Sequence, residues 1–159
     1  MRSTSDICDE FPNDIRILSP IFKSYGKRSH FGGQVITVQC FEDNSQIKAL
    51  SAEQGNSRIV VVDGGGSLNK ALMGDLIAAA FIQNGWAGIV INGCVRDVEI
   101  LNTLPFGIRA LNSIPLKTER KGQGSQGDPV VLAGVTINTG DYMVVDDTGI
   151  VVSDRPIHL

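Results

Sequence analysis

The sequence has few of the residues on which zinc sites and disulfide frameworks depend. Its 159 residues include two histidines, His30 and His158, which lie too far apart in sequence to indicate a metal site. The three cysteines, Cys8, Cys40 and Cys94, are odd in number and show no CxxC spacing. We therefore expect reduced cysteines. We interpret Cys94 as a small buried side chain, because no histidine lies near it in sequence.

Long apolar runs and an excess of basic charge are also missing. The longest apolar run, residues 76–82, is far too short to cross a bilayer. The N-terminus, MRSTSDICDEFPND, lacks the apolar core of a secretory signal. A formal net charge of −3 and a pI near 5.3 give no electrostatic reason to bind nucleic acid. We expect a cytoplasmic protein with neither a membrane nor a direct nucleic-acid partner, folded as a single domain over residues 1–159.

The elements that are present alternate in type along the first half of the chain. Helical patterns fall at 45–52, 75–84 and 96–103. This order predicts an α/β fold with a parallel βαβ centre, extended by antiparallel strands from the C-terminal part. The strands are predicted from seven runs rich in β-branched residues, at 35–39, 58–62, 88–92, 106–111, 130–137, 142–145 and 149–152.

Glycine-rich punctuation separates these elements. Asn84-Gly85 is expected to end a helix, with Trp86 packed against that helix. The turn at 63–66, DGGG, fits no phosphate-binding motif and is interpreted as a connection. The segment 121–129 predicts a mobile loop, and the basic cluster at 117–121 a solvated one.

Three charged residues bracket the apolar stretch that contains the helix predicted at 75–84 and the strand predicted at 88–92. Asp75 opens it, and Arg96 and Asp97 close it. A right-handed crossover would make the strands at 58–62 and 88–92 parallel, so the segments that follow them leave from the same edge of the sheet. We therefore expect Asp75, Arg96 and Asp97 to lie on one rim.

The residue types on this rim suit the binding of a small acid. Arg96 offers a planar cation for a carboxylate or for an oxygen that becomes negative during reaction. Asp97 is a hard oxygen ligand for a cation such as Mg²⁺. Free N–H groups at a helix start can hold a substrate carboxylate, and here they belong to Gly74, Asp75, Leu76 and Ile77.

Structural explanations for the same residues remain open. Acids near a helix start are stabilised by about 0.3–1 kcal/mol each, which alone explains Asp75 and Asp97. An adjacent Arg and Asp often form only a solvated pair. Other charged residues, Glu42, Asp43, Lys48 and Lys70, are interpreted as turn or surface residues.

Four segments, at 31–44, 61–75, 84–101 and 133–153, resemble the family called regulator of ribonuclease activity A, which overlaps the class II 4-hydroxy-4-methyl-2-oxoglutarate aldolases. The resemblance covers nearly the whole chain from about residue 7. The most specific element is Gly-Asp, twenty intervening residues and Arg-Asp, here Gly74-Asp75 and Arg96-Asp97. The chain is shorter than the dedicated aldolases of this family. Some ribonuclease regulators lack the acid that follows the arginine, and Asp97 is present here.

The resemblance implies a swivelling β/β/α domain in a ring-shaped homotrimer, with active sites between subunits and a divalent cation, Mg²⁺ or Mn²⁺. It implies that Asp97 binds the metal, Arg96 the keto or enolate oxygen, and the backbone from Gly74 to Ile77 the carboxylate. The implied reaction cleaves 4-hydroxy-4-methyl-2-oxoglutarate to two pyruvates, with oxaloacetate decarboxylation as a side activity. Asp75 is the candidate for handling the hydroxyl proton.

A second hypothesis from the same resemblance is a regulator that binds and inhibits ribonuclease E. The two hypotheses do not exclude each other, because a trimer can offer both a cleft and an outer face.

Overall fold

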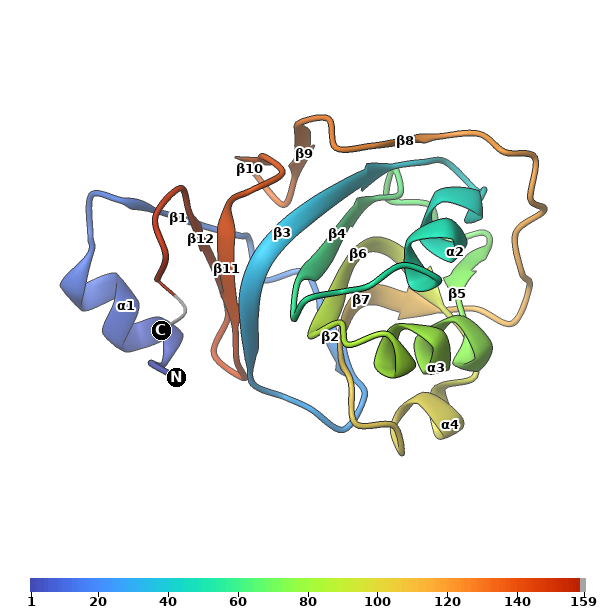
Figure 1. Ribbon diagram of the computed structural model, residues 1–159, viewed down its shortest axis with the longest axis horizontal. Helices are drawn as coiled ribbons and strands as arrows, with labels where there is room; N and C mark the ends of the chain where they lie inside the picture. Colours follow the sequence, from blue (N-terminus) through green and yellow to red (C-terminus); the bar gives the residue numbers. More distant parts are fainter. Residues whose placement is uncertain (158–159) are drawn as a thin grey trace.

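A computed structural model describes residues 1–157 and has one large mixed sheet at its centre (Figure 1). The main path of the sheet runs β1-β12-β11-β3-β4-β6-β7-β2, with β5 pairing with β6 and β8 with β3. A separate hairpin, β9–β10, completes the strands. The strands are β1 (Ile15–Ile17), β2 (Lys23–Tyr25), β3 (Phe31–Gln39), β4 (Ile59–Asp63), β5 (Ala71–Met73), β6 (Gly88–Val95), β7 (Gly107–Ser113), β8 (Ser125–Gln126), β9 (Val130–Leu132), β10 (Val135–Ile137), β11 (Tyr142–Val145) and β12 (Ile150–Ser153).

The centre of the sheet is parallel, as the sequence predicts. Strands β3, β4, β6 and β7 pair in parallel, while β1, β11 and β12 add antiparallel ladders on one side and β2 on the other. Strand β4 has the composition of a parallel strand that is covered on both faces. Four of its five residues, Ile59 to Val62, are apolar and buried. The mixed α/β fold with a parallel βαβ centre is confirmed.

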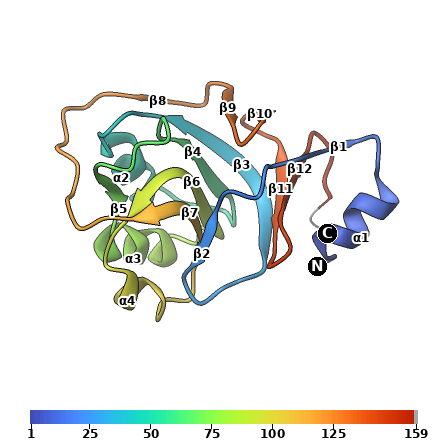
Figure 2. The same ribbon diagram turned by 180° about the vertical axis from the view of Figure 1, so that it is seen from behind.

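Two apolar clusters on opposite faces of the parallel strands give the molecule its β/β/α layering. Helices pack on one face, where Phe81 and Leu50 join Val60 and Ile89. On the other face the antiparallel strands and the hairpin pack, for example through Met143 against the sheet. Figures 1 and 2 show three helices together on one side and α1 at the far end with β1 and β12. The helices are α1 (Thr4–Glu10), α2 (Ser45–Ser51), α3 (Asp75–Gln83) and α4 (Val98–Leu101).

Helix α3 ends where its sequence predicts. Gly85 takes a positive φ of 79° just after Asn84, a conformation that glycine adopts without penalty. Trp86 then packs edge-on against Phe81 of the helix, with ring centroids 5.5 Å apart. This ring contact confirms the expected packing of Trp86 on its helix. The indole N–H of Trp86 also donates to the carbonyl of Glu53 at 2.9 Å.

Several predicted segments differ in the structure, and the strand predicted at 35–39 begins earlier, at Phe31. The run at 130–137 is a hairpin, because Ala133 and Gly134 both have positive φ and turn the chain between β9 and β10. Strand β6 continues to Val95, three residues past its predicted end. The helix predicted at 96–103 is shorter in the structure, where it corresponds to α4. It begins only after Asp97, because the left-handed backbone angles of Asp97 are incompatible with a right-handed helix.

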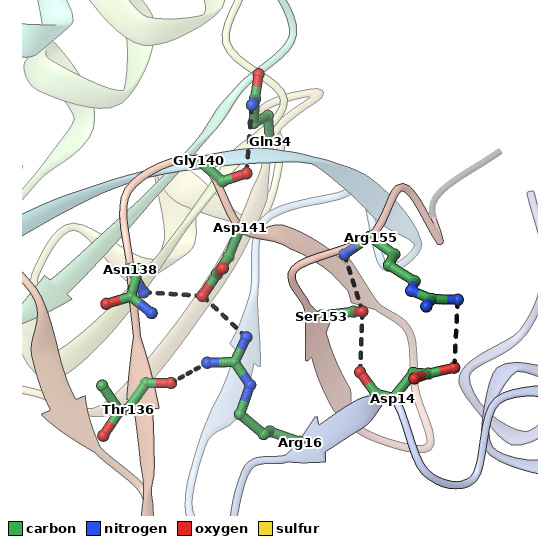
Figure 3. Close-up of polar contacts among 9 residues, drawn as sticks. All are labelled: Asp14, Arg16, Gln34, Thr136, Asn138, Gly140, Asp141, Ser153 and Arg155. Carbon is green, nitrogen blue, oxygen red and sulfur yellow. Dashed lines mark hydrogen bonds and ion pairs between the residues drawn. The ribbon is translucent and has the colours of Figure 1, made fainter.

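Polar contacts hold β1 against the antiparallel side of the sheet (Figure 3). Arg16 forms an ion pair with the buried carboxylate of Asp141 at 3.0 Å and also donates to the carbonyl of Thr136. The same carboxylate accepts from the amide of Asn138 at 2.8 Å. Arg16 thereby connects β1 with the segment between β10 and β11.

Candidate active site

Two loop-to-helix corners meet at the edge of the sheet where β5 and β6 end. Gly74 precedes α3, and Arg96 and Asp97 connect β6 to α4. The amide of Arg96 donates to the carbonyl of Met73 at 2.9 Å. The amide of Asp75 donates to Oδ2 of Asp97 at 3.1 Å. The structure therefore brings Asp75, Arg96 and Asp97 together on one rim, as the sequence predicts.

Glycine is needed at position 74 because side-chain atoms of Arg96 and Asp97 lie close to it, and not because of its backbone angles. Its φ is −127°, which any residue adopts. A Cβ at this position would lie 2.4 Å from Oδ2 of Asp97 and 3.4 Å from Nε of Arg96. A side chain of any size would therefore displace the carboxylate of Asp97 or the start of α3.

Asp97 occupies a left-handed backbone conformation, with φ 58° and ψ 40°. Aspartate tolerates this region better than most residues, but non-glycine residues in it are uncommon and tend to occur at functional sites. The conformation places its carboxylate beside the start of α3, where the free N–H groups of the first turn attract negative charge. Its Oδ2 lies 3.9 Å from Nε of Arg96, and both side chains are about one-third exposed.

The start of α3, which the sequence predicts to hold a substrate carboxylate, lies on this rim. Its N-cap residue, Gly74, has no side chain that could occupy the amides of the first turn. The amide of Asp75 is already used by Asp97. The amides of Leu76 and Ile77 are the ones that remain suited to a ligand, and Leu76 itself is 81% exposed.

Both corners open into a cavity of about 440 Å³, a size typical of small-molecule sites. The near wall contains all the residues singled out in the sequence, from Gly74 to Ile77 together with Arg96 and Asp97. The far wall was not predicted. It consists of Asn44, Lys117, Thr118, Glu119 and Arg120.

Apart from Asn44, the far wall belongs to the segment at 117–121, interpreted from sequence as a solvated loop. Its side chains are largely exposed, except for the buried Thr118. Its backbone is fixed to β5, because the amide of Ala71 donates to the carbonyl of Leu116 at 2.7 Å and the amide of Thr118 to the carbonyl of Ala71 at 3.3 Å. In Figures 1 and 2 this segment passes along the same side of the molecule as β5 and α2.

Asp43 fixes the other end of the same segment. It is 2% exposed, and its Oδ2 accepts from the backbone amides of Lys121 and Gln123 at 2.8 and 3.2 Å. Burial alone would raise the pKa of Asp43, but hydrogen bonds from the Ser45 hydroxyl and amide, and from these two amides, lower it to about 2. The expected mobile loop at 121–129 is therefore tied down, and β8 within it pairs with β3. Asp43 is a buried anchor and not a plain turn residue.

Two buried polar atoms beside the cavity have no partner. Among residues 1–157, three buried side-chain polar atoms lack a hydrogen bond, and Oδ1 of Asn44 and Oγ1 of Thr118 are two of them. The Nδ2 of Asn44 donates to the carbonyl of Leu72, which orients its Oδ1 away from that carbonyl. Unsatisfied buried groups are rare in folded proteins, and both of these belong to residues that line one cavity. Their position favours the cavity as a functional site.

The oxygen-rich lining fits a hydrated divalent cation better than a fully protein-bound one. In the described part of the chain no cluster of three or more His, Cys, Asp or Glu residues can hold a metal ion. Mg²⁺ commonly uses one or two carboxylates and keeps several waters. Asp97 meets this requirement, with Asp75 and Glu119 lining the same cavity.

The remaining candidates are structural. Burial, with the nearby carboxylates of Asp43 and Asp63, raises the pKa of Cys40 to about 12, and burial also raises the pKa of Cys94. Both cysteines are therefore thiols at neutral pH.

The charged residues interpreted as turn or surface residues also have structural positions. Lys48 is exposed, and Glu42 accepts hydrogen bonds from the side chains of two residues in the turn at 67–69. The turn at 63–66 contains two glycines with positive φ, and His158 lies outside the described residues.

The fold and the cavity define a class of small β/β/α protein that carries a polar cavity at the carboxyl ends of its parallel strands. Residues 4–152 match the model of the RraA-like family, described as Aldolase/RraA. The chain belongs to this family.

Comparison with individual proteins agrees with the family and shows that its members have different names. A protein of Marinomonas sp. (strain MWYL1), provisionally named a 4-hydroxy-4-methyl-2-oxoglutarate aldolase, is 50% identical over 97% of this chain and 96% of its own. The structure of the RNA-processing inhibitor RraA from "Thermus thermophilis" is 36% identical with a TM-score of 0.95, covering 98% of this chain and 94% of its own. A Geobacillus kaustophilus HTA426 structure described as an S-adenosylmethionine: 2-dimethylmenaquinone methyltransferase is 33% identical with a TM-score of 0.96, over 98% and 97% of the two chains.

One further observation concerns the membrane. Within residues 1–157, no helix combines the length and apolar character needed to span a bilayer.

Proposed function

We propose that the protein is a divalent-metal-dependent lyase that cleaves 4-hydroxy-4-methyl-2-oxoglutarate to two pyruvates and decarboxylates oxaloacetate as a side activity. The observation that carries this proposal is the convergence of the Gly74-Asp75 and Arg96-Asp97 corners on one cavity. The provisional name of the Marinomonas relative, at 50% identity, supports the same reaction.

Substrate binding would begin at the start of α3. The C1 carboxylate would accept from the first-turn amides of Leu76 and Ile77, where the helix dipole favours negative charge. Arg96, partly exposed on the same rim, would direct its guanidinium to the 2-oxo oxygen. These contacts would orient the C3–C4 bond toward Asp75.

Both reactions then pass through the enolate of pyruvate. In the aldol cleavage the C4 hydroxyl loses its proton, the C3–C4 bond breaks, and its electron pair becomes part of the enolate. Protonation at C3 gives the second pyruvate. Asp75 would take the hydroxyl proton through a water, and Arg96 would stabilise the charge that develops on the 2-oxo oxygen.

Asp97 would hold the cation, Mg²⁺ or Mn²⁺. When bound there, it supplies positive charge next to the oxygen that becomes negative. Asp97 is suited to this role because its left-handed backbone holds the carboxylate beside the amide of Asp75.

Pyruvate release from 4-hydroxy-4-methyl-2-oxoglutarate tests the proposal. We expect release in the presence of Mg²⁺ or Mn²⁺, its loss on adding EDTA, and a reduction of at least a hundredfold in Asp97→Ala. Cleavage that continues at the wild-type rate in EDTA or in Asp97→Ala would contradict the proposal.

A second function is supported by the likeness to the Thermus RNA-processing inhibitor. The protein would bind ribonuclease E through an outer surface and reduce RNA cleavage. Titration of purified ribonuclease E with this protein, with RNA cleavage and complex formation as readouts, tests it. No binding at micromolar concentration would overturn this second function and would leave the lyase proposal unaffected.

A further inference from the structure

The far wall of the cavity carries two cations without ion-pair partners. Lys117 and Arg120 both line the cavity and are exposed. None of the ion pairs within residues 1–157 includes either residue. The neighbouring Glu119 has its Oε2 3.8 Å from Nζ of Lys121. The negative charge of Glu119 is therefore balanced by Lys121, which does not line the cavity, and not by Lys117 or Arg120. The wall therefore presents positive charge that no protein group neutralises by direct contact.

The structure holds these cations at a set place across the cavity. Residues 116–118 are hydrogen-bonded to Ala71 of β5, the strand that leads directly into Gly74. Asp43 anchors the backbone on the other side, at Lys121 and Gln123. A segment fixed at both ends loses less conformational entropy when a ligand binds than a free loop would lose. Thr118, with its unpartnered buried hydroxyl, lies between the two cations in sequence.

The near wall already accounts for one end of a 2-oxo acid. The amides of α3 and the guanidinium of Arg96 suit the C1 carboxylate and the 2-oxo oxygen, which leaves Lys117 and Arg120 without a role. A cavity of about 440 Å³ has room for a six-carbon acid with a second carboxylate. Lysine and arginine bind such a group through charge-assisted hydrogen bonds.

We infer that Lys117 and Arg120 form a subsite for the remote carboxylate, so that the site selects dicarboxylic 2-oxo acids over monocarboxylic ones. This inference rests on the proposed lyase function and adds a basis for its selectivity. The two residues determine specificity and take no part in the bond-breaking step.

Two substrates that differ only at the remote group test the inference. One is 4-hydroxy-4-methyl-2-oxoglutarate. The other is 4-hydroxy-4-methyl-2-oxopentanoate, in which a methyl group replaces the remote carboxylate and cleavage gives pyruvate and acetone. The ratio of their kcat/KM values is measured with Mg²⁺ in the wild type, Lys117→Met, Arg120→Met and the double variant. Lys48→Met is the matched control, because it removes the same charge from an exposed side chain that does not line the cavity.

We expect the preference for the dicarboxylate to fall about tenfold in each single variant and further in the double variant, mainly through KM for the dicarboxylate. Lys48→Met should keep the wild-type preference. An unchanged ratio in the double variant, or an equal fall in Lys48→Met, would overturn the subsite while leaving the lyase function intact.

Failure of the proposed function gives a different result. A wild-type protein that cleaves neither acid contradicts the lyase, and both acids can then be titrated calorimetrically without turnover. Tighter binding of the dicarboxylate that is lost in the double variant would still support the subsite. Equal binding of the two acids, or binding of neither, would overturn it.

Discussion

At the scale of single residues, Gly74 determines whether the two corners can meet. An added methyl group would lie 2.4 Å from Oδ2 of Asp97, so Gly74→Ala must displace either the carboxylate or the start of α3. We expect kcat/KM for the dicarboxylate to fall by about a hundredfold, since misplacement by about 1 Å has effects of this size. Gly149→Ala is the matched control, because its Cβ meets open space and its φ is not positive. Wild-type kinetics in Gly74→Ala would contradict this role.

Asp43 provides a second prediction at this scale, from its depressed pKa. A carboxylate whose pKa is lower in the folded state stabilises the protein fully above its ordinary value of 3.8 and loses that contribution as the pH falls through about 2. We expect Asp43→Asn to unfold at lower urea concentration than the wild type at pH 5 to 7. The difference should shrink between about pH 4 and pH 2. A difference that stays constant across this acidic range would show that the lowered pKa of Asp43 is not its source.

The sequence predicted the near wall of the site but not the far wall, and the reason is physical. Arg96 follows a recognisable strand, β6, and Asp75 opens a recognisable helix between β4 and β6, two parallel strands whose carboxyl ends lie at one edge. Lys117 and Arg120 follow no regular element that places them. Their position depends on long-range backbone hydrogen bonds to Ala71 and Asp43, which leave no pattern in the sequence.

At the scale of elements, the ring of Phe31 packs against two neighbouring strands, β6 and β7, at a position where each strand has a glycine. Its fully buried ring lies where a Cβ at Gly88 or Gly107 would be, 2.4 and 2.2 Å from ring atoms. We expect Gly107→Ala to lower the free energy of unfolding by about 1–3 kcal/mol through overpacking. Phe31→Leu in the same chain should recover part of that loss, because it removes the ring atoms that clash. Urea unfolding of the four members of this cycle measures the coupling, and strictly additive effects would contradict the packing model.

The elements that were predicted and those that were missed differ in how local their signals are. Strands β3, β4 and β6 each contain a run of β-branched residues, and α3 ends at an Asn-Gly stop, so each is visible in sequence. Strands β2, β5 and β8 have two or three residues, too few to show a period. The hairpin β9–β10 was read as one strand because its turn, Ala133-Gly134, adds only one glycine to an apolar run.

At the scale of the whole molecule, we propose the ring-shaped homotrimer implied by the family resemblance. Leu76 lies on the rim of the cavity and is 81% exposed, which a neighbouring subunit would cover. Light scattering coupled to gel filtration should give about three times the chain mass of 17.0 kDa. Leu76→Glu should shift the mass toward that of one chain, whereas Val131→Glu, a change at an exposed valine in the hairpin, serves as the control. A wild-type mass of 17.0 kDa would contradict the trimer.

The two corners at Gly74-Asp75 and Arg96-Asp97 are proposed to bind one small acid together, and a crystal soaked with pyruvate and Mn²⁺ tests this binding. We predict an anomalous peak beside the Asp97 carboxylate, with the pyruvate carboxylate on the amides of Leu76 and Ile77 and its oxo group facing Arg96. Pyruvate bound away from these residues, or manganese bound at a site without Asp97, would contradict it.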